Sequence, residues 1–257
     1  MKFSTFGRRA CRKLRYLLEK PYTAFQIKEA GVAVRSPMTH AERCVTLQLM
    51  HYLEGSNLVV YDVGASFGSY TSALAKMDRV DRVVAFEPIP SVFQSLSGKM
   101  STYPQVTCLN LALGDENGSA TFYESAFSYS SSMLPMKDLH KTEFPQSAES
   151  KAIEVQVARL DDLVKERNLP PPDFVKMDVQ GFEDRVIRGG SATIARAKYC
   201  MLEVSLTPLY EGAPLFDDLY GEMRRIGFHL VGVVDQVTGT SGRTLQIDAV
   251  FQRDGSI

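Results

Sequence analysis

An acidic, glycine-containing turn at residues 62–68 carries the clearest chemical signal in the chain. It follows the apolar run 58–61 and precedes a helix-like segment, 70–77. Glycines between a strand and a helix let the backbone approach a polar ligand closely. Glu87 ends the next apolar run, and an acid one strand further on is how nucleotide-binding sheets hold a ribose. The two features together predict a ribose-containing ligand.

Two missing elements narrow the choice of ligand. A dinucleotide-binding fingerprint reads G-x-G-x-x-G, and here Asp62 stands where its first glycine belongs. A phosphate-binding P-loop needs G-K-[ST], which does not occur. This pattern disfavours a nicotinamide-dependent dehydrogenase and favours a ligand with a ribose but no phosphate, of which S-adenosylmethionine (SAM) is the common one. For the turn by itself, a purely structural role is the alternative.

Composition and charge exclude several other classes. The 257 residues are 44% hydrophobic and 23% charged, which fits one large domain or a domain with an extension. A net charge of -1 gives no case for nucleic-acid binding. The four cysteines are scattered without C-x-x-C, which indicates free thiols and a reducing compartment. No run approaches the ~20 apolar residues of a membrane span, and no apolar signal-peptide region is present. A cytoplasmic protein is expected.

The first 57 residues are expected to form a helical extension. Residues 1–20 fit a basic amphipathic helix, which could lie on an anionic membrane surface or be a solvated cap on the domain or a partner subunit. Pro21 ends it. A second helix is predicted over 39–54, because Thr39 and Glu42 have the spacing of a capping box and Gly55 supplies a stop.

From residue 58 to residue 257, strand-like and helix-like segments alternate, which predicts an α/β domain with a parallel sheet covered by helices on both faces. The last two apolar runs are joined by Gly- and Thr-rich residues with no room for a helix, so the final strand should be antiparallel. Strands are expected at 58–63, 82–87, 106–111, 173–179, 199–204, 228–234 and 245–252, and helices at 68–77, 90–100, 182–196 and 215–226.

An insertion at about 115–158 interrupts this alternation. Residues 119–123 and 153–158 alternate like strands and should form a β-hairpin. The serine-rich, polar stretch 124–151 between them is predicted to be a mobile loop without regular structure, either near the ligand or merely on the surface. Residues 159–167 should form a short helix ended by three prolines.

Six short motifs in this order resemble the FkbM-type SAM-dependent methyltransferases. The resemblance covers roughly residues 58–250, and the second and last motifs are its most specific parts. The motifs are Asp62-Val63-Gly64-Ala65-Ser66-Phe67-Gly68, Ala85-Phe86-Glu87-Pro88, Ala112-Leu113-Gly114-Asp115, Ser130-Ser131-Ser132, Arg159-Leu160-Asp161-Asp162 and Lys176-Met177-Asp178-Val179-Gln180-Gly181-Phe182-Glu183.

The resemblance implies a Rossmann-like class I methyltransferase fold, with strand order 3-2-1-4-5-7-6 and an antiparallel seventh strand. It also implies that Asp62, Gly64, Ala65, Ser66 and Gly68 lie at the methionine part of SAM. Glu87 would accept hydrogen bonds from both ribose hydroxyls, with Pro88 fixing the turn, and Ala112 and Leu113 would border the adenine. The family often has Asn at the position of Ser66 and Glu at that of Gln180, so the resemblance assigns no chemistry to these two side chains.

Asp178 is the candidate for work at the reacting end of SAM, because it follows a strand at the edge where open α/β sheets bind ligands. Three roles stay open. It could be the general base for a substrate hydroxyl, bind a divalent metal with Glu203, or organise the site by hydrogen bonds. His40, His140 and His229 are alternative bases, although each fits an ordinary surface or core position.

The predicted function is an O-methyltransferase that acts on a hydroxyl of a saccharide, glycolipid or glycosylated metabolite. The saccharide comes from the family alone. Specificity for the acceptor is expected in the N-terminal helices and the 124–151 loop. The alternative is a non-catalytic SAM-binding or scaffold protein that docks on a membrane or partner through residues 1–20. Retention of Asp62, Gly64 and Glu87 favours the enzyme.

Overall fold

The structure is a computed structural model that describes residues 23–125 and 130–255. The basic helix predicted over residues 1–20 lies outside the described residues. Residues 23–29 are helical and lead to α2, His40–Leu49. The predicted capping box of α2 is confirmed: Glu42 N–H donates to Thr39 Oγ1 at 3.3 Å, and Thr39 N–H donates to Glu42 Oε2 at 2.6 Å. The helix is shorter than predicted, because turns after Leu49 carry Leu53 into the core.

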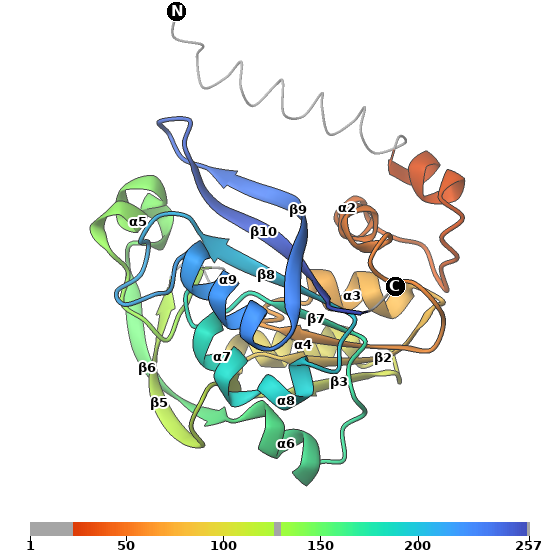
Figure 1. The fold of residues 1–257 in the computed structure, drawn as a ribbon, viewed down its shortest axis with the longest axis horizontal. Helices are drawn as coiled ribbons and strands as arrows, with labels where there is room; N and C mark the ends of the chain where they lie inside the picture. Colours follow the sequence, from red (N-terminus) through yellow and green to blue (C-terminus); the bar gives the residue numbers. More distant parts are fainter. Residues whose placement is uncertain (1–22, 126–129, 256–257) are drawn as a thin grey trace, which may run out of the picture.

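A seven-stranded sheet forms the centre of the molecule (Figure 1). Its order is β3-β2-β1-β7-β8-β10-β9. Numbered along this sheet alone, that is 3-2-1-4-5-7-6, as predicted. The strands are β1 Leu58–Val63, β2 Val80–Phe86, β3 Val106–Leu109, β7 Phe174–Met177, β8 Tyr199–Ser205, β9 Phe228–Thr238 and β10 Thr244–Arg253.

The direction of the last strand is also confirmed. β1 pairs in parallel with β2 and β7, and β7 pairs in parallel with β8. β10 runs antiparallel to both β8 and β9. Because β1 lies between β2 and β7, the segments that follow these three strands meet at one edge of the sheet.

Helices cover both faces of the sheet, which agrees with the predicted α/β layering (Figure 1). Alternate residues of each strand face opposite sides, so Val83 and Val84 of β2 belong to different apolar clusters. The helices are α3 Ser69–Lys76, α4 Pro90–Met100, α6 Leu160–Glu166, α7 Glu183–Gly189, α8 Ser191–Ile194 and α9 Phe216–Arg225.

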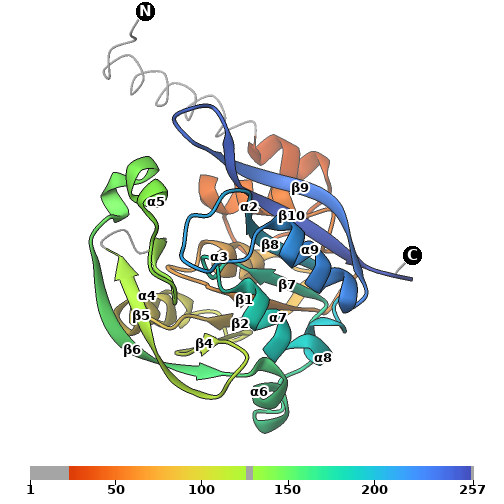
Figure 2. The same ribbon diagram turned by 60° about the vertical axis from the view of Figure 1, so that its left-hand side comes forward.

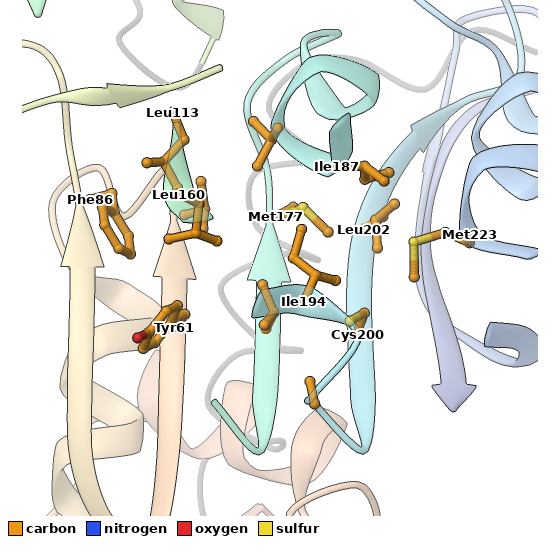
Figure 3. Close-up of a cluster of buried hydrophobic side chains, with 14 of the residues drawn as sticks. Tyr61, Phe86, Leu113, Leu160, Met177, Ile187, Ile194, Cys200, Leu202 and Met223 are labelled. Atoms are coloured by element: carbon orange, nitrogen blue, oxygen red, sulfur yellow. The ribbon is translucent and has the colours of Figure 1, made fainter. Parts of the chain in front are cut away.

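The larger cluster packs α6, α7, α8 and α9 against one face. Figure 3 shows side chains of the strands, among them Tyr61, Met177 and Leu202, beside Leu160, Ile187 and Met223 of the helices. All are at most 1% exposed. Burial on this scale is the main stabilising contribution, at roughly 1.5–3 kcal/mol for each large apolar side chain.

The other face receives α2, α3 and the segment before them. Ile27, Val45 and Leu49 share a cluster with Val60 of β1 and Leu74 of α3. The described part of the predicted N-terminal extension therefore packs directly on the seven-stranded sheet.

The single helix predicted over 182–196 is wrong, because it divides at the glycine pair Gly189–Gly190. A Cβ atom at Gly189 would lie 1.8 Å from the Gly114 carbonyl oxygen. The close approach of these two segments requires glycine, and the pair breaks the helix.

The insertion adds a second sheet of three strands in the order β4-β6-β5 (Figure 2). The predicted hairpin is confirmed, since β5 pairs antiparallel with β6. Residues 112–113 belong to this sheet as β4, so the third strand of the main sheet ends earlier than predicted. The strands are β4 Ala112–Leu113, β5 Gly118–Ser125 and β6 Ser150–Ala158.

The prediction that 124–151 lacks regular structure is wrong for its described part. It contains α5, Asp138–Glu143, and a short 3-10 turn, Pro145–Ser147. Apolar residues of this segment, including Met136 and Phe144, pack with Tyr210 and Leu245, and that packing orders the chain. Figures 1 and 2 both place α5 at the end of the β5–β6 hairpin.

In residues 23–125 and 130–255, none of the helices has the length and apolar character needed to span a membrane.

A buried ion pair joins α2 to α3. Lys76 Nζ lies 2.8 Å from Glu42 Oε2, and the two side chains are 10% and 6% exposed. Ser72 Oγ donates to the other oxygen of Glu42. Although burial acts in the opposite direction, these hydrogen bonds lower the pKa of Glu42 from 4.5 to about 2.

We expect Glu42→Gln to destabilise the fold by about 2–3 kcal/mol, because it leaves a buried ammonium without its counter-charge. The folded-state pKa is lowered, so the ion pair stabilises above pH 4.5 and is lost as the pH falls towards 2. Urea unfolding at pH 7 and pH 3 should show a difference between wild type and variant that shrinks at pH 3.

Glu54→Gln is the matched control, because the Glu54–Lys198 pair has the same 2.8 Å separation but is exposed. It should change the unfolding free energy little. An equal loss of unfolding free energy in Glu42→Gln and Glu54→Gln would contradict a larger contribution from the buried Glu42–Lys76 pair.

Candidate active site

A pocket lies where the segments after β1, β2, β3 and β7 converge. It is lined by Val63, Gly64, Ser66, Phe86, Glu87, Pro88, Ile89, Leu111, Ala112, Leu113, Phe122, Ser131, Met133, Asp178, Val179, Gln180 and Phe182. Most of these residues follow strands at one edge of the main sheet, where open α/β sheets bind ligands. Phe122, Ser131 and Met133 come from the insertion, which closes one side of the pocket.

The turn after β1 is held against two neighbouring strands. Gly64 N–H and Ala65 N–H both donate to the Phe86 carbonyl oxygen, at 3.1 and 2.9 Å. Gly64 has φ +77°, and a Cβ atom there would lie 1.8 Å from the Asp178 carbonyl oxygen. Only glycine therefore lets the turn pass between the ends of β2 and β7.

Glu87 is buried at 4% exposure and presents its carboxylate to the pocket. Oε2 accepts from Ser66 N–H at 2.9 Å, and Oε1 accepts from Ile89 N–H at 2.9 Å. Burial raises the pKa of Glu87 to about 7, against the effect of these two hydrogen bonds. Both carboxylate oxygens are thus fixed in position, and each keeps a further lone pair for a ligand donor.

The structure brings most of the predicted site residues onto this pocket and leaves three outside its lining. Gly64, Ser66, Glu87, Pro88, Ala112, Leu113 and Asp178 line it. Asp62 is fully buried behind the turn, where Thr71 Oγ1 donates to Oδ2 at 2.6 Å. Ala65 packs in an apolar cluster with α4, and Gly68 precedes α3 as its N-cap.

A buried ammonium lies beneath the Asp178 end of the pocket. Lys176 Nζ is 3.4 Å from Asp62 Oδ1, 3.5 Å from Asp178 Oδ2 and 3.1 Å from the Gly64 carbonyl oxygen, to which it donates. It also lies 5.0 Å from the ring centroid of Tyr70. Burial alone would lower the pKa of Lys176, but the charges of Asp178 and Asp62 raise it. The cation offsets the repulsion between the two carboxylates.

Gln180 separates the first pocket from a second one. Its Nε2 donates to Asp178 Oδ1 at 2.8 Å and to Glu203 Oε2. Glu203 lines the second pocket together with Asp235, Gln236, Val237, Gln246, Ile247 and Asp248. Burial, with the charges of Asp178 and Asp248, raises the pKa of Glu203 well above its ordinary value. Burial and the nearby Asp178 raise the pKa of Asp248 to about 6.

The predicted alternative of a metal held by Asp178 and Glu203 has little geometric support. The amide nitrogen of Gln180 is hydrogen-bonded to both carboxylates. Within residues 23–125 and 130–255, no group of three or more His, Cys, Asp or Glu side chains is arranged to hold a metal ion.

Glu183, the last residue of the most specific motif, has a structural place. Its carboxylate accepts from Val179 N–H at 3.0 Å and from Gly181 N–H at 3.1 Å. Burial raises its pKa to about 7. Glu183 therefore fixes the segment after β7 from which Asp178 and Gln180 project.

Sequence reasoning missed several residues of the site. Lys176 and Gln180 belong to a motif that was singled out, but nothing in their types showed that they would contact Asp178. Phe122 lies in a segment with strand-like alternation, which predicts burial without naming what it covers. Tyr210, which donates to Gln180 Oε1 at 2.6 Å, has no local sequence signal at all.

A seven-stranded sheet of this order, with an acid after β2 and an acid after β7 at one pocket, defines a Rossmann-like class I methyltransferase. A family model described as "Methyltransferase FkbM domain" matches residues 62–230. The chain therefore belongs to the FkbM family of methyltransferases.

Two curated relatives are methyltransferases. The name of the first gives the position that is methylated, and the name of the second gives the compound that is methylated. The 2-O-methyltransferase NoeI of Sinorhizobium fredii is 28% identical over 77% of this chain and 84% of its own length. The hexuronic acid methyltransferase AglP of Haloferax volcanii is 26% identical over 57% of this chain and 55% of its own length.

The fold also matches a solved structure. The crystal structure of methyltransferase FkbM from Methylobacillus flagellatus superposes with a TM-score of 0.50 at 15% identity. The match covers 94% of this chain and 60% of the other. At this level of identity, the likeness concerns the fold.

We expect Gly64→Ala to cost about 3 kcal/mol or more of stability and to abolish binding of SAM in calorimetry. The new Cβ meets the Asp178 carbonyl, and the left-handed backbone adds strain.

Gly55→Ala is the control, because Gly55 has φ +94° but its Cβ would meet only Leu58, at 4.0 Å. It should lose about 1–2 kcal/mol of stability from strain and keep SAM affinity. Unchanged SAM affinity in Gly64→Ala would disprove the close approach at the pocket.

Proposed function

We propose that the chain is a SAM-dependent O-methyltransferase that transfers a methyl group to a hydroxyl of a saccharide or glycosylated molecule. The observation that carries the proposal is the placement of both Glu87 and Asp178 in the lining of one pocket at the strand ends. Membership of the methyltransferase family supports the reaction type. The name of NoeI supports transfer to an oxygen, and the name of AglP supports a sugar acceptor.

The pocket fits the methyl donor in three respects. Glu87 offers two fixed carboxylate oxygens for the ribose hydroxyls. Ala112, Leu113 and Ile89 offer an apolar wall to a flat base. Ser66 lines the pocket, and its Oγ is shielded from solvent without a hydrogen-bond partner within the described chain. A buried hydroxyl without a partner is costly unless a ligand satisfies it.

Asp62 and Lys176 are assigned supporting roles behind the donor. The Asp62 carboxylate lies behind the turn, where it accepts a hydrogen bond from Thr71 and forms an ion pair with Lys176. We therefore infer that it acts on the methionine end of SAM by ordering the turn, through the Lys176 contact with the Gly64 carbonyl. Gly68, Ala65 and Pro88 shape the backbone around the ligand.

The second pocket is the proposed place of the acceptor. It adjoins Asp178 through Gln180 and is lined by carboxylate and amide groups that can hydrogen-bond to hydroxyls. The Asp178 side chain is 34% exposed, whereas its neighbour Lys176 is 5% exposed. An incoming hydroxyl can therefore reach Asp178 more readily than it can reach Lys176.

Bound SAM would supply an electrophilic methyl group on its sulfonium. Asp178, held by Lys176 and Gln180, accepts the proton of the acceptor hydroxyl while the oxygen–carbon bond forms and the sulfur–carbon bond breaks. The two pockets on either side of Gln180 would align donor and acceptor, which is the main requirement of such a displacement.

The direct test is transfer from methyl-labelled SAM to p-nitrophenyl glycosides of neutral hexoses, deoxyhexoses and a hexuronic acid. The product should carry base-stable label on a sugar oxygen. We expect Asp178→Asn to lower kcat by about 100-fold or more while SAM affinity is retained.

Asp173→Asn is the matched control at the opposite end of β7, where Asp173 accepts from Val59 N–H at 2.8 Å. It should retain kcat. Failure of the wild type to bind SAM in calorimetry would remove the proposed function, and wild-type kcat in Asp178→Asn would remove the base.

Affinity for SAM should depend on pH through Glu87. The pKa of Glu87 is about 7, and the ribose hydroxyls need the deprotonated carboxylate as acceptor. Affinity should therefore rise as the pH increases through about 7 and fall below it. Calorimetry between pH 5.5 and 8.5 measures this.

Glu87→Gln isolates the contribution of Glu87 from titration of SAM itself, because an amide does not titrate. The variant should bind more weakly at pH 8 and show a flatter dependence on pH. Identical pH dependence in wild type and variant would refute the assignment.

A further inference from the structure

Gln180 is held in a backbone conformation that is unfavourable for its residue type. Its φ is +55°, and the other non-glycine residues of the described chain with positive φ are Asn57, Ser66 and Asn168. A glutamine lacks the short side chain that lets asparagine adopt this region. Such a conformation persists only where the surroundings enforce it.

The insertion supplies that enforcement. Ser132 is 1% exposed, and its Oγ donates to the Gln180 carbonyl oxygen at 2.7 Å. The same Oγ accepts from Leu134 N–H at 3.0 Å. The serine-rich segment thus fixes the backbone of Gln180 from the side opposite to β7.

The side chain of Gln180 is fixed by a different contact. Its nitrogen faces the carboxylates of Asp178 and Glu203, and its Oε1 accepts from the Tyr210 hydroxyl at 2.6 Å. If the amide were rotated by half a turn, its oxygen would face two carboxylate groups. The Asp178 carboxylate and the Tyr210 hydroxyl therefore favour the same orientation of the amide, and Tyr210 holds its oxygen end.

Tyr210 is itself oriented by the insertion. Its hydroxyl has one proton and three neighbours: Gln180 Oε1, His140 Nε2 at 3.1 Å and the Ser130 carbonyl at 3.2 Å. With its proton on the shortest contact, the hydroxyl oxygen can accept from His140 in the Nε2–H tautomer. Burial lowers the pKa of His140, so the ring is neutral and carries one N–H.

We propose that His140 and Tyr210 are positioning residues of methyl transfer, which set the orientation of the Gln180 amide and through it the arrangement of Asp178. The inference rests on the proposed function of Asp178. We call the series of contacts from His140 through Tyr210 to Gln180 the relay. His140 lies on α5 in the insertion and Tyr210 follows β8, so the relay connects two segments that are 70 residues apart in sequence.

The residues of the relay are more deeply buried than Asp178, the proposed reacting group. Gln180, Tyr210 and His140 are 9%, 0% and 2% exposed, whereas the Asp178 side chain is 34% exposed. The charged and titratable groups around Asp178 are Lys176 and Glu183, Glu203, Asp248, Asp62 and Tyr70. Carboxylates therefore lie on several sides of Asp178. If Asp178 lost the hydrogen bond from Gln180, Lys176 would be its remaining favourable partner among these groups.

The central test compares Tyr210→Phe with Tyr61→Phe. Tyr61 is also fully buried, and its hydroxyl donates to the Pro170 carbonyl at 2.7 Å, away from the pocket. Both variants lose one buried hydroxyl of the same kind. We expect Tyr210→Phe to lower kcat about tenfold or more, with KM for SAM within about twofold of wild type, and Tyr61→Phe to retain kcat. The acceptor is the glycoside of the panel that the wild type methylates.

A second pair of variants keeps the test decisive if Tyr210→Phe fails to fold. His140→Gln retains an N–H donor near the place of Nε2, and His140→Leu removes it. His140→Leu should lower kcat, and His140→Gln should recover most of it. A purely structural histidine would show no such rescue.

An NMR measurement tests the relay without any acceptor. The side-chain amide signals of Gln180, assigned by their loss in Gln180→Leu, should shift in Tyr210→Phe and not in Tyr61→Phe. Unchanged amide signals and wild-type kcat in both Tyr210→Phe and His140→Leu would overturn the proposal. Shifted signals with no transfer by the wild type would overturn the proposed function and leave the relay standing.

Discussion

The buried ammonium of Lys176 is the interaction on which the site depends. It contacts the carboxylates of Asp62 and Asp178 and the carbonyl oxygen of Gly64. These groups come from two adjacent parallel strands, β1 and β7. Without the cation, two buried or half-buried acids would repel each other across the narrow gap between the strand ends. One positive charge thus holds together the turn after β1 and the Asp178 carboxylate.

The same gap explains the backbone of the turn. Gly64 and the Asp178 carbonyl approach so closely that no side chain fits between them. Glu87, one strand away, is then fixed to the turn by the Ser66 N–H. The geometry of the donor pocket therefore follows from strand order, because β1 must lie between β2 and β7 for these contacts to form.

The sequence predicted the fold well because its signals are local and periodic. Alternating strands and helices, the Thr39–Glu42 capping box and the terminal hairpin were all confirmed by the structure. The helix after Asp178 was wrongly predicted to be continuous: it breaks at the Gly189–Gly190 pair, and the need for glycine at 189 comes from Gly114, far away in sequence. Several residues that line the first pocket were recognisable from their motifs as site candidates. Tyr210 and the α5 segment were not, because their contacts depend on tertiary packing that leaves no periodic pattern.

The insertion contributes to the site in several separate ways. Phe122 and Met133 line the donor pocket, Ser132 holds the Gln180 backbone, and α5 carries the histidine beside Tyr210. These contributions come from one continuous stretch that is joined to the core at both ends by β4 and β6. A stretch built in this way cannot be exchanged between relatives as an independent module. Transplanting it would also replace residues that line the first pocket and that hold Gln180 in place.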